Sequence, residues 1–424
     1  MRKRLDLRTL LIAAVFLRVV VYVVLGPTGS DHHYEVIESI LRDGRLPLAE
    51  QYAQAFHPPA YYLLSLPWAM LGGDRFVEVF SLLLSILNLW LLFTLISSAT
   101  FIQDERARWH GLALTAFLPH LVIYSILVSN DTLAMVAGTL ALLAALRFHS
   151  DPRLSNAALA GLVAALGLLT KGTLIAQAGV LLFVVAVVSW QRLPVRRAAA
   201  CVAIFLALTV SLGSYKFIEN QGRYGRPIVH NMDFGQDWVE AQRPTIVGVQ
   251  SLIDVNIVTL LREPYAELRQ GGWTNLQSVP LLLYATFWHP YVPVSNFRGT
   301  WEKVPVIAQA TYLLAIPATL MIVAGWLAAA RRPLVWIPLA FFAANLAIVI
   351  AAGVKYDAWS CFQSRLLFPS FPAIAFGYAW GIETTDRRWP AMTRFVDMTC
   401  VALYAAFLTY FTFEIVSVVI RTLG

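Results

Sequence analysis

The chain has 424 residues, of which 58% are hydrophobic and only 13% are charged, and its mean hydropathy is +0.64. Soluble globular proteins carry about 25% charged residues and about 45–50% apolar ones, so this composition argues against a soluble enzyme, a disordered chain or a nucleic-acid-binding domain. The net charge of +7 is typical of a membrane protein anchored by cytoplasmic lysine and arginine residues.

Long apolar segments follow one another along most of the chain. A helix needs about 20 mostly apolar residues to cross a bilayer. We therefore predict an all-α integral membrane protein, a polytopic bundle of about 11 transmembrane helices in a single domain over residues 1–424. The predicted spans are residues 7–25, 75–99, 109–128, 132–148, 156–170, 172–190, 198–218, 304–328, 334–353, 366–382 and 395–420.

The positions of lysine and arginine indicate which helix ends face the cytoplasm, because short cytoplasmic loops are enriched in these residues. A hairpin over residues 156–190, with its tip at 170–172, keeps every basic cluster on one side. Two long polar segments, residues 26–74 and 219–303, are then predicted to lie outside. The basic clusters fall around residues 2–8, 106–108, 147–153, 192–197, 331–332 and 387–394.

The first outer loop, residues 26–74, is predicted to contain two juxtamembrane helices. Over residues 34–44 apolar and polar side chains separate onto different helical faces, a pattern typical of a helix lying on the membrane surface. Ser30 or Asp31 can cap this helix. A second, aromatic-rich helix is predicted over residues 58–72, since prolines suit its first turn and two glycines end it.

The same loop carries residues that can do chemistry. Asp31, His32 and His33 follow directly on the first span, and His57 comes later. One interpretation is a helix-capping aspartate with solvated histidines, and the other is a functional cluster. The four side chains are also suitable ligands for a divalent metal ion, although neighbouring residues of a helix point about 100° apart. The pattern establishes no cofactor, and a divalent ion is the candidate.

Further polar residues stand at predicted outer ends of spans. Asn130 and Asp131 precede the fourth span, where helix capping is the alternative role. Lys171 lies at the hairpin tip, with no other charge from residue 156 to residue 190. A lysine there can extend to the membrane interface, but an ionisable residue between apolar segments is a functional candidate.

The second outer loop, residues 219–303, is long enough to form a small, partly helical cap over a site. The next outer segment joins the ninth and tenth predicted spans and carries Lys355, Gln363 and Arg365. These cations would lie at the depth of a lipid headgroup. Interface anchoring is the alternative role for Arg365.

Taken in order, these segments resemble the GT-C superfamily of polytopic glycosyltransferases, of the protein mannosyltransferase and lipid A aminoarabinose transferase type. Its hallmark is an acidic residue in the first outer loop, followed by two juxtamembrane helices. Many members have a second acid beside the first, where this chain has His32 and His33. The resemblance extends from residue 1 to about 382. It is carried by SDHHYEV with Asp31, FHPPAYYLL, VSNDTLAMVAGTLAL with Asn130 and Asp131, GLLTKGTLI with Lys171, and QSRLLFPSFPAIA with Arg365.

The resemblance implies a hexosyl- or pentosyltransferase that takes a monosaccharide from a polyprenyl-phosphate donor, with Asp31 as the catalytic residue. The other site residues would bind substrate. They are His32, His33, Tyr34, His57, Tyr61, Tyr62, Asn130, Asp131, Lys171, Lys355, Gln363 and Arg365.

An outward-facing transferase needs a lipid-linked donor, because nucleotide sugars are made inside the cell. The departing lipid phosphate needs nearby cations, and a carboxylate can take the proton of the attacking hydroxyl. A single carboxylate predicts inversion at the sugar carbon. We expect a multi-pass protein of a bacterial or archaeal plasma membrane, with membrane lipids and a glycan, lipid or protein acceptor as partners, and no nucleic acid. The rival interpretations are a secondary transporter and a non-catalytic lipid-binding membrane protein.

Overall fold

The computed structural model of the protein describes residues 6–26, 31–99, 101–235, 248–264, 276–290, 304–332 and 334–423. Within these ranges all regular secondary structure is helical, as the sequence predicts. The α-helices are α1 (Leu7–Leu25), α2 (His33–Asp43), α3 (Ala60–Ser98), α4 (Glu105–Phe117), α5 (Pro119–Tyr124), α6 (Asp131–Ser150), α7 (Leu154–Thr170), α8 (Ile175–Arg192), α9 (Val195–Gly213), α10 (Tyr215–Tyr224), α12 (Gln250–Ile253), α13 (Ile257–Arg262), α14 (Val279–Trp288), α15 (Pro305–Ala329), α16 (Trp336–Tyr356), α17 (Phe371–Arg388) and α18 (Thr393–Leu423). The short 3-10 segments are η1 (Gly172–Leu174), η2 (Asn231–Phe234), η4 (Trp359–Phe362), η5 (Ser364–Ser370) and η6 (Pro390–Met392).

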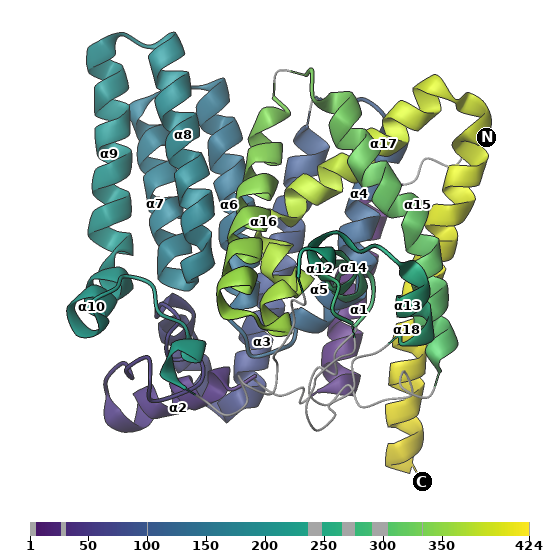
Figure 1. Ribbon diagram of the computed structural model, residues 1–424, viewed down its shortest axis with the longest axis horizontal. Coiled ribbons are helices and arrows are strands. Elements are labelled where there is room, and N and C mark those ends of the chain that lie inside the picture. Colours follow the sequence, from purple (N-terminus) through teal and green to yellow (C-terminus); the bar gives the residue numbers. More distant parts are fainter. Residues whose placement is uncertain are drawn as a thin grey trace.

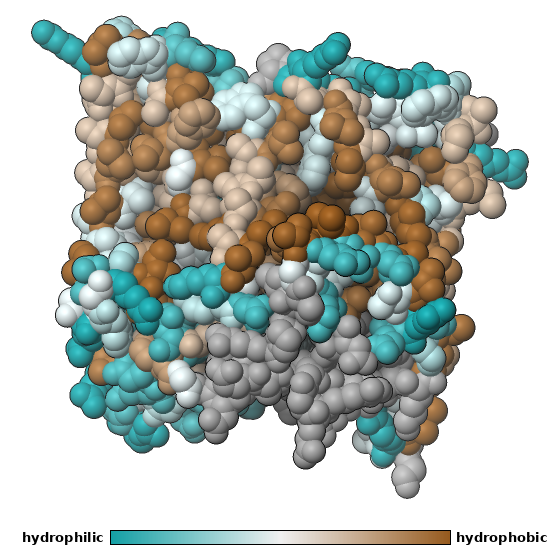
Figure 2. Space-filling model, in the orientation of Figure 1, coloured by the Kyte–Doolittle hydropathy of each residue, from teal (hydrophilic) through white to brown (hydrophobic). Residues whose placement is uncertain are grey.

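Eight helical segments of the described chain are long and apolar enough to cross a membrane. Figure 2 shows an apolar belt across the molecule between hydrophilic upper and lower rims. The chain is therefore a multi-pass membrane protein. Every predicted span coincides with helical structure, α4 and α5 together forming the third one. The number of eleven crossings stays a prediction, because α7 and some other segments are shorter than a full crossing.

The helices form two groups that lie next to each other (Figure 1). One group contains α6 to α9, in which α7 packs against α9 and α6. The other contains α15, α17 and α18, with α15 packed against both partners. The turn between α8 and α9 lies at the upper edge, whereas α2 and α10 lie at the lower edge. The basic cluster at 192–197 and the first outer loop therefore occupy opposite ends of the bundle.

The first outer loop forms the two helices expected from its sequence. α2 lies at the lower edge of the bundle, and the second helix is the first arm of α3. Gly72 and Gly73 have non-helical backbone angles and separate this arm from the membrane span. Gly73 has φ +67°, which favours glycine. The expected cap of α2 by Asp31 is wrong: the N-cap is His32, and no side chain caps the helix.

The third span is broken between α4 and α5 at Pro119, which has no backbone N–H to donate. Arg18 of α1 fills the gap. Its guanidinium donates to the carbonyl groups of Thr115 and Ala116, at 3.2 and 2.9 Å, and to Ser85 Oγ at 3.1 Å. Carbonyl groups that the break leaves free are thus satisfied inside the membrane, where an unpaired one is costly.

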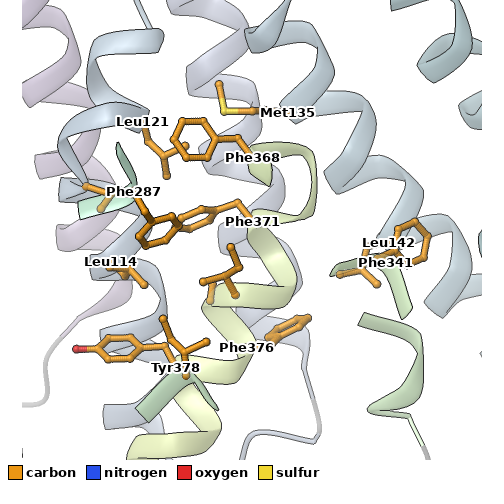
Figure 3. Close-up of a cluster of buried hydrophobic side chains, with 14 of the residues drawn as sticks. Leu114, Leu121, Met135, Leu142, Phe287, Phe341, Phe368, Phe371, Phe376 and Tyr378 are labelled. Atoms are coloured by element: carbon orange, nitrogen blue, oxygen red, sulfur yellow. The ribbon is translucent and has the colours of Figure 1, made fainter. Parts of the chain in front are cut away.

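A cluster of aromatic and aliphatic side chains fixes η5 and the start of α17 in the middle of the protein. The ring of Phe371 lies parallel to Phe287 of α14, with centroids 6.0 Å apart, and Phe368 lies beside Leu121 and Met135 (Figure 3). This packing joins α5, α6 and α14 to η5. Because η5 also carries Arg365, the hydrophobic core determines where that cation stands.

Candidate active site

Four charged side chains from distant parts of the chain meet at one end of the helical bundle. Asp31 Oδ2 lies 3.1 Å from Arg365 Nη1, and Asp131 Oδ2 lies 3.9 Å from the same nitrogen. Lys171 Nζ donates a hydrogen bond to Asp131 Oδ1. The charges alternate in sign along the row Asp31, Arg365, Asp131, Lys171, which we call the charge row. All four belong to the set of site residues predicted from the sequence.

The inner half of the charge row is more buried than the outer half. The side chain of Asp31 is 45% exposed and that of Arg365 22%, whereas Asp131 and Lys171 are only 4% and 7% exposed. Buried charges are tolerated when they are paired, and here the inner pair neutralises itself. The outer carboxylate remains accessible to a ligand.

The backbone of η5 places Arg365 from several sides. The amide of Ser364 donates to Thr286 Oγ1 at 2.9 Å, and Asn345 Nδ2 donates to the Leu366 carbonyl at 2.9 Å. On the α6 side, a Cβ on Gly138 would stand 2.0 Å from the Pro369 carbonyl oxygen. Only glycine lets α6 approach η5 this closely.

Asp131 is bound by side chains, and neither it nor Asn130 caps α6. Asn130 occupies the N-cap position without a side-chain cap bond, and its Nδ2 donates to the Thr170 carbonyl at 3.4 Å. Ser129 Oγ donates to Asp131 Oδ2 at 3.1 Å. The Asn130 contact joins the start of α6 to the end of α7, and neither side chain makes the hydrogen bond of a helix cap.

Tyr124 is a member of the site that sequence reasoning missed. Its hydroxyl lies 2.9 Å from Arg365 Nη1, and its ring centroid lies 5.7 Å from the guanidinium carbon. It stands at the end of α5 in the largely apolar stretch of residues 121–128, where Ser125 is the one other polar residue and no charge marks a site. The Pro119 break, which starts a new helix before it, is the feature that could have drawn attention.

Histidine and tyrosine rings stack beside the charge row. The His33 and His57 rings are nearly parallel with centroids 5.7 Å apart, and His33 Nδ1 lies 3.0 Å from the Tyr62 hydroxyl. Tyr61 packs edge-on against Tyr62 and bonds Ser81 at 3.0 Å. Burial lowers the pKa of His33 to about 4, although Asp31 opposes this shift. Burial likewise lowers the pKa of His57, so both rings are neutral at pH 7.

The histidines do not form a metal site with Asp31. The side chain of His32 points to Glu35, with His32 Nδ1 2.7 Å from Glu35 Oε1. His33 contacts the Tyr62 hydroxyl, and Asp31 pairs with Arg365. Among the described residues no group of three or more His, Cys, Asp or Glu side chains could hold a metal ion. The candidate metal ligands therefore do not fit a metal in this arrangement.

Three more of the predicted residues, Lys355, Gln363 and Tyr34, also lie outside the charge row. Lys355 Nζ donates to the Tyr356 hydroxyl at 3.0 Å, and that hydroxyl donates to Asp233 of the second outer loop at 3.2 Å. Gln363 is the residue before η5, and Tyr34 lies against the α3 kink at Gly73. Of the predicted cap, residues 236–247, 265–275 and 291–303 lie outside the described residues.

Comparison with known proteins supports the resemblance seen in the sequence. Residues 56–214 match the family described as dolichyl-phosphate-mannose-protein mannosyltransferase. This segment includes His57, Asn130, Asp131 and Lys171 but neither Asp31 nor Arg365. No curated protein matches the chain significantly.

Solved structures extend the comparison to the whole chain. An Archaeoglobus fulgidus oligosaccharyltransferase tethered to an acceptor peptide superposes with a TM-score of 0.51 and 12% identity, over 96% of this chain and 55% of that one. The chain therefore shares its fold with this membrane oligosaccharyltransferase. The predicted resemblance is thus confirmed for the fold.

Two further GT-C structures superpose with lower scores. ArnT from Cupriavidus metallidurans bound to undecaprenyl phosphate gives a TM-score of 0.41 and 17% identity, over 90% of this chain and 78% of that one. Arabinofuranosyltransferase AftD from Mycobacteria gives 0.48 and 17%, over 97% and 27%. The chain spans little more than half the length of the Archaeoglobus oligosaccharyltransferase.

Proposed function

We propose that the protein is a glycosyltransferase that moves a monosaccharide from a polyprenyl-phosphate donor to a cell-envelope glycan, lipid or protein. The charge row carries this proposal, because it sets an accessible carboxylate directly against cations at the outer ends of membrane helices. The GT-C fold and the match to a family named for dolichyl-phosphate-mannose support it.

Arg365 and Lys171 would bind the phosphate that leaves the sugar. Arginine holds phosphate oxygens with two parallel hydrogen bonds, and lysine acts as a compact point charge. The polar contacts of Arg365 with Asp31, Asp131 and Tyr124 are all made by Nη1. The Nε of Arg365 is buried and has no hydrogen-bond partner among the described residues. The guanidinium thus keeps donor capacity that a phosphate could use.

Asp31 would act as the general base. The acceptor oxygen forms a bond to the sugar carbon, the bond from that carbon to the phosphate oxygen breaks, and the hydroxyl proton passes to Asp31. The leaving group departs as polyprenyl phosphate, whose charge the cations balance. Direct displacement inverts the configuration of the sugar carbon, and no covalent sugar–enzyme intermediate is needed.

The donor phosphate and the Asp31 carboxylate compete for the guanidinium of Arg365. A lipid phosphate that engages Arg365 must weaken the hold of Arg365 on Asp31. Asp31 is therefore restrained before the donor arrives and released toward the acceptor afterwards. Neutralising Asp31 is expected to stop transfer and to strengthen phosphate binding.

The central experiment measures release of undecaprenyl phosphate from a panel of undecaprenyl-phosphate hexoses and pentoses by the purified protein in nanodiscs. We expect turnover of at least one donor by the wild type and loss of at least 100-fold in Asp31→Asn. Equal release by both proteins, or no release from any donor, would overturn the proposal. Solute uptake into sealed vesicles without a covalent product would favour a transporter.

We propose further that the site faces the outside of a bacterial or archaeal plasma membrane. The three native cysteines are buried, so introduced ones can be labelled against a low background. Arg45→Cys in the first outer loop should react with an impermeant thiol reagent added to intact cells, and Arg196→Cys should not. The opposite result would reverse the orientation and remove the argument for a lipid-linked donor.

A further inference from the structure

The backbone around Asp31 is unusual. Asp31 has φ +43° and His32 has φ +63°, and of the non-glycine residues in the described ranges only Asp357 shares such values. Side chains disfavour this left-handed region, although aspartate and histidine tolerate it better than most. Two consecutive residues in this region need contacts that hold them there.

Gln54 supplies such a contact. The Nε2 of its side chain donates to the Asp31 carbonyl at 3.0 Å, and its backbone carbonyl accepts from the Tyr62 hydroxyl at 2.9 Å. Since that hydroxyl gives its proton to Gln54, His33 Nδ1 must donate to the Tyr62 oxygen, 3.0 Å away. The chain of contacts from Asp31 through Gln54 and Tyr62 returns to His33, two residues further on. It closes a ring around the left-handed turn.

The turn decides between two roles for the Asp31 carboxylate. If His32 relaxed to the ordinary helical region, α2 would begin one residue earlier and Asp31 would become its N-cap. Aspartate is among the preferred N-cap residues, because its carboxylate accepts hydrogen bonds from the first helical amides. In the observed turn α2 has no side-chain cap, and the carboxylate faces Arg365.

We propose that Gln54 is a positioning residue, which keeps Asp31 against Arg365 as a base and prevents it from becoming the cap of α2. Nothing in the sequence pattern marks Gln54, which lies in the irregular part of the first outer loop. The proposal rests on the role proposed above for Asp31. Gln54 touches neither substrate nor phosphate and acts through the backbone of Asp31.

The test compares Gln54→Ala and the isosteric Gln54→Glu with Asp31→Asn and the wild type. The first readout is affinity for undecaprenyl phosphate, measured on the purified protein in detergent. If loss of Gln54 lets Asp31 turn away, both Gln54 variants should bind the phosphate more tightly by a factor of about 1.4 to 5, as Asp31→Asn does. Combining Gln54→Ala with Asp31→Asn should give no further gain, because both changes remove the same contact.

The second readout is turnover, in which the kcat of Gln54→Ala should fall at least 10-fold. Gln51→Ala is the matched control, because Gln51 accepts only from the Leu48 amide in the same loop, and it should behave as the wild type. A Gln54 variant that binds phosphate as the wild type does, or more weakly, overturns the proposal. If Asp31→Asn retained full activity while the affinity pattern held, the proposed function would fail and the positioning of Asp31 by Gln54 would stand.

Discussion

Replacing Asp31 by asparagine should tighten the binding of undecaprenyl phosphate while it abolishes transfer. The substitution keeps the shape of the side chain but removes the charge that Arg365 faces at 3.1 Å. A residue that merely helped to bind the donor would weaken binding when changed. The opposite sign is specific to a carboxylate that competes with the phosphate for one guanidinium.

The size of the effect follows from the exposure of the pair. Both side chains are partly open to solvent, at 45% and 22%, and ion pairs of this kind contribute about 0.2–1 kcal/mol. Since about 1.4 kcal/mol corresponds to tenfold in affinity, the dissociation constant should fall by a factor of about 1.4 to 5. The gain should shrink at high ionic strength, because salt screens the competing charge.

The assay is equilibrium binding of undecaprenyl phosphate to the wild type and to Asp31→Asn at low and high salt. Asp43→Asn is the control, because Asp43 pairs with Arg42 at 2.9 Å at the other end of α2 and should leave affinity unchanged. Weaker binding by Asp31→Asn, or a gain that salt does not reduce, would refute the competition.

Three further outcomes follow from the geometry. Lys171→Met should lower stability by about 3 kcal/mol, because it strips the buried Asp131 of its closest cation; adding Asp131→Asn should restore the melting temperature but not phosphate binding. Gly138→Ala should lower the free energy of unfolding by about 1–3 kcal/mol, because the new methyl group overpacks against Pro369, and it should weaken phosphate binding by displacing η5. The control is Gly179→Ala in α8, where the new methyl group meets open space; it should change neither the melting temperature nor phosphate binding. Burial lowers the pKa of His33 to about 4. As the pH falls from 6.5 toward 4, His33 is protonated in the unfolded chain before it is protonated in the folded one, so its contribution to the free energy of unfolding is fully present above pH 6.5 and is lost over this range. The loss is about 3 kcal/mol, should appear as a lower melting temperature at pH 5 than at pH 7.5, and should be smaller in His33→Asn.

The bundle was predictable because long apolar segments leave few alternatives in a membrane. Two details of the fold differ from the sequence prediction. The tenth predicted span begins as the 3-10 segment η5, since Pro369 and Pro372 interrupt regular hydrogen bonding at its start. The cap expected at Asp31 is absent because Asp31 and His32 both have left-handed backbone angles, so that His32 occupies the N-cap position.

The candidate site was predictable only as separate charges at helix ends. Asp131 and Lys171 stand 40 positions apart, and their pairing depends on how α6 and α7 pack. Lys355 and Arg365 look equivalent in the sequence, yet the short η4 turn between them directs Lys355 to Tyr356 and Arg365 to Asp31. Tyr124 and Gln54 carry no charge, so no sequence pattern distinguished them from ordinary core and loop residues.

The broken third span makes two distant positions depend on each other. Arg18 is buried in the membrane-spanning helix α1 and donates to carbonyl groups beside Pro119, which has no backbone N–H to serve them. In Pro119→Ala the helix could continue through residue 119, and Arg18 would then be a buried cation without these carbonyl partners. In Arg18→Leu the carbonyl groups of Thr115 and Ala116 would lose their hydrogen-bond donor. Each single substitution should therefore lower the stability of the fold more than the two together. An uninterrupted helix should also move the Tyr124 hydroxyl away from the guanidinium of Arg365.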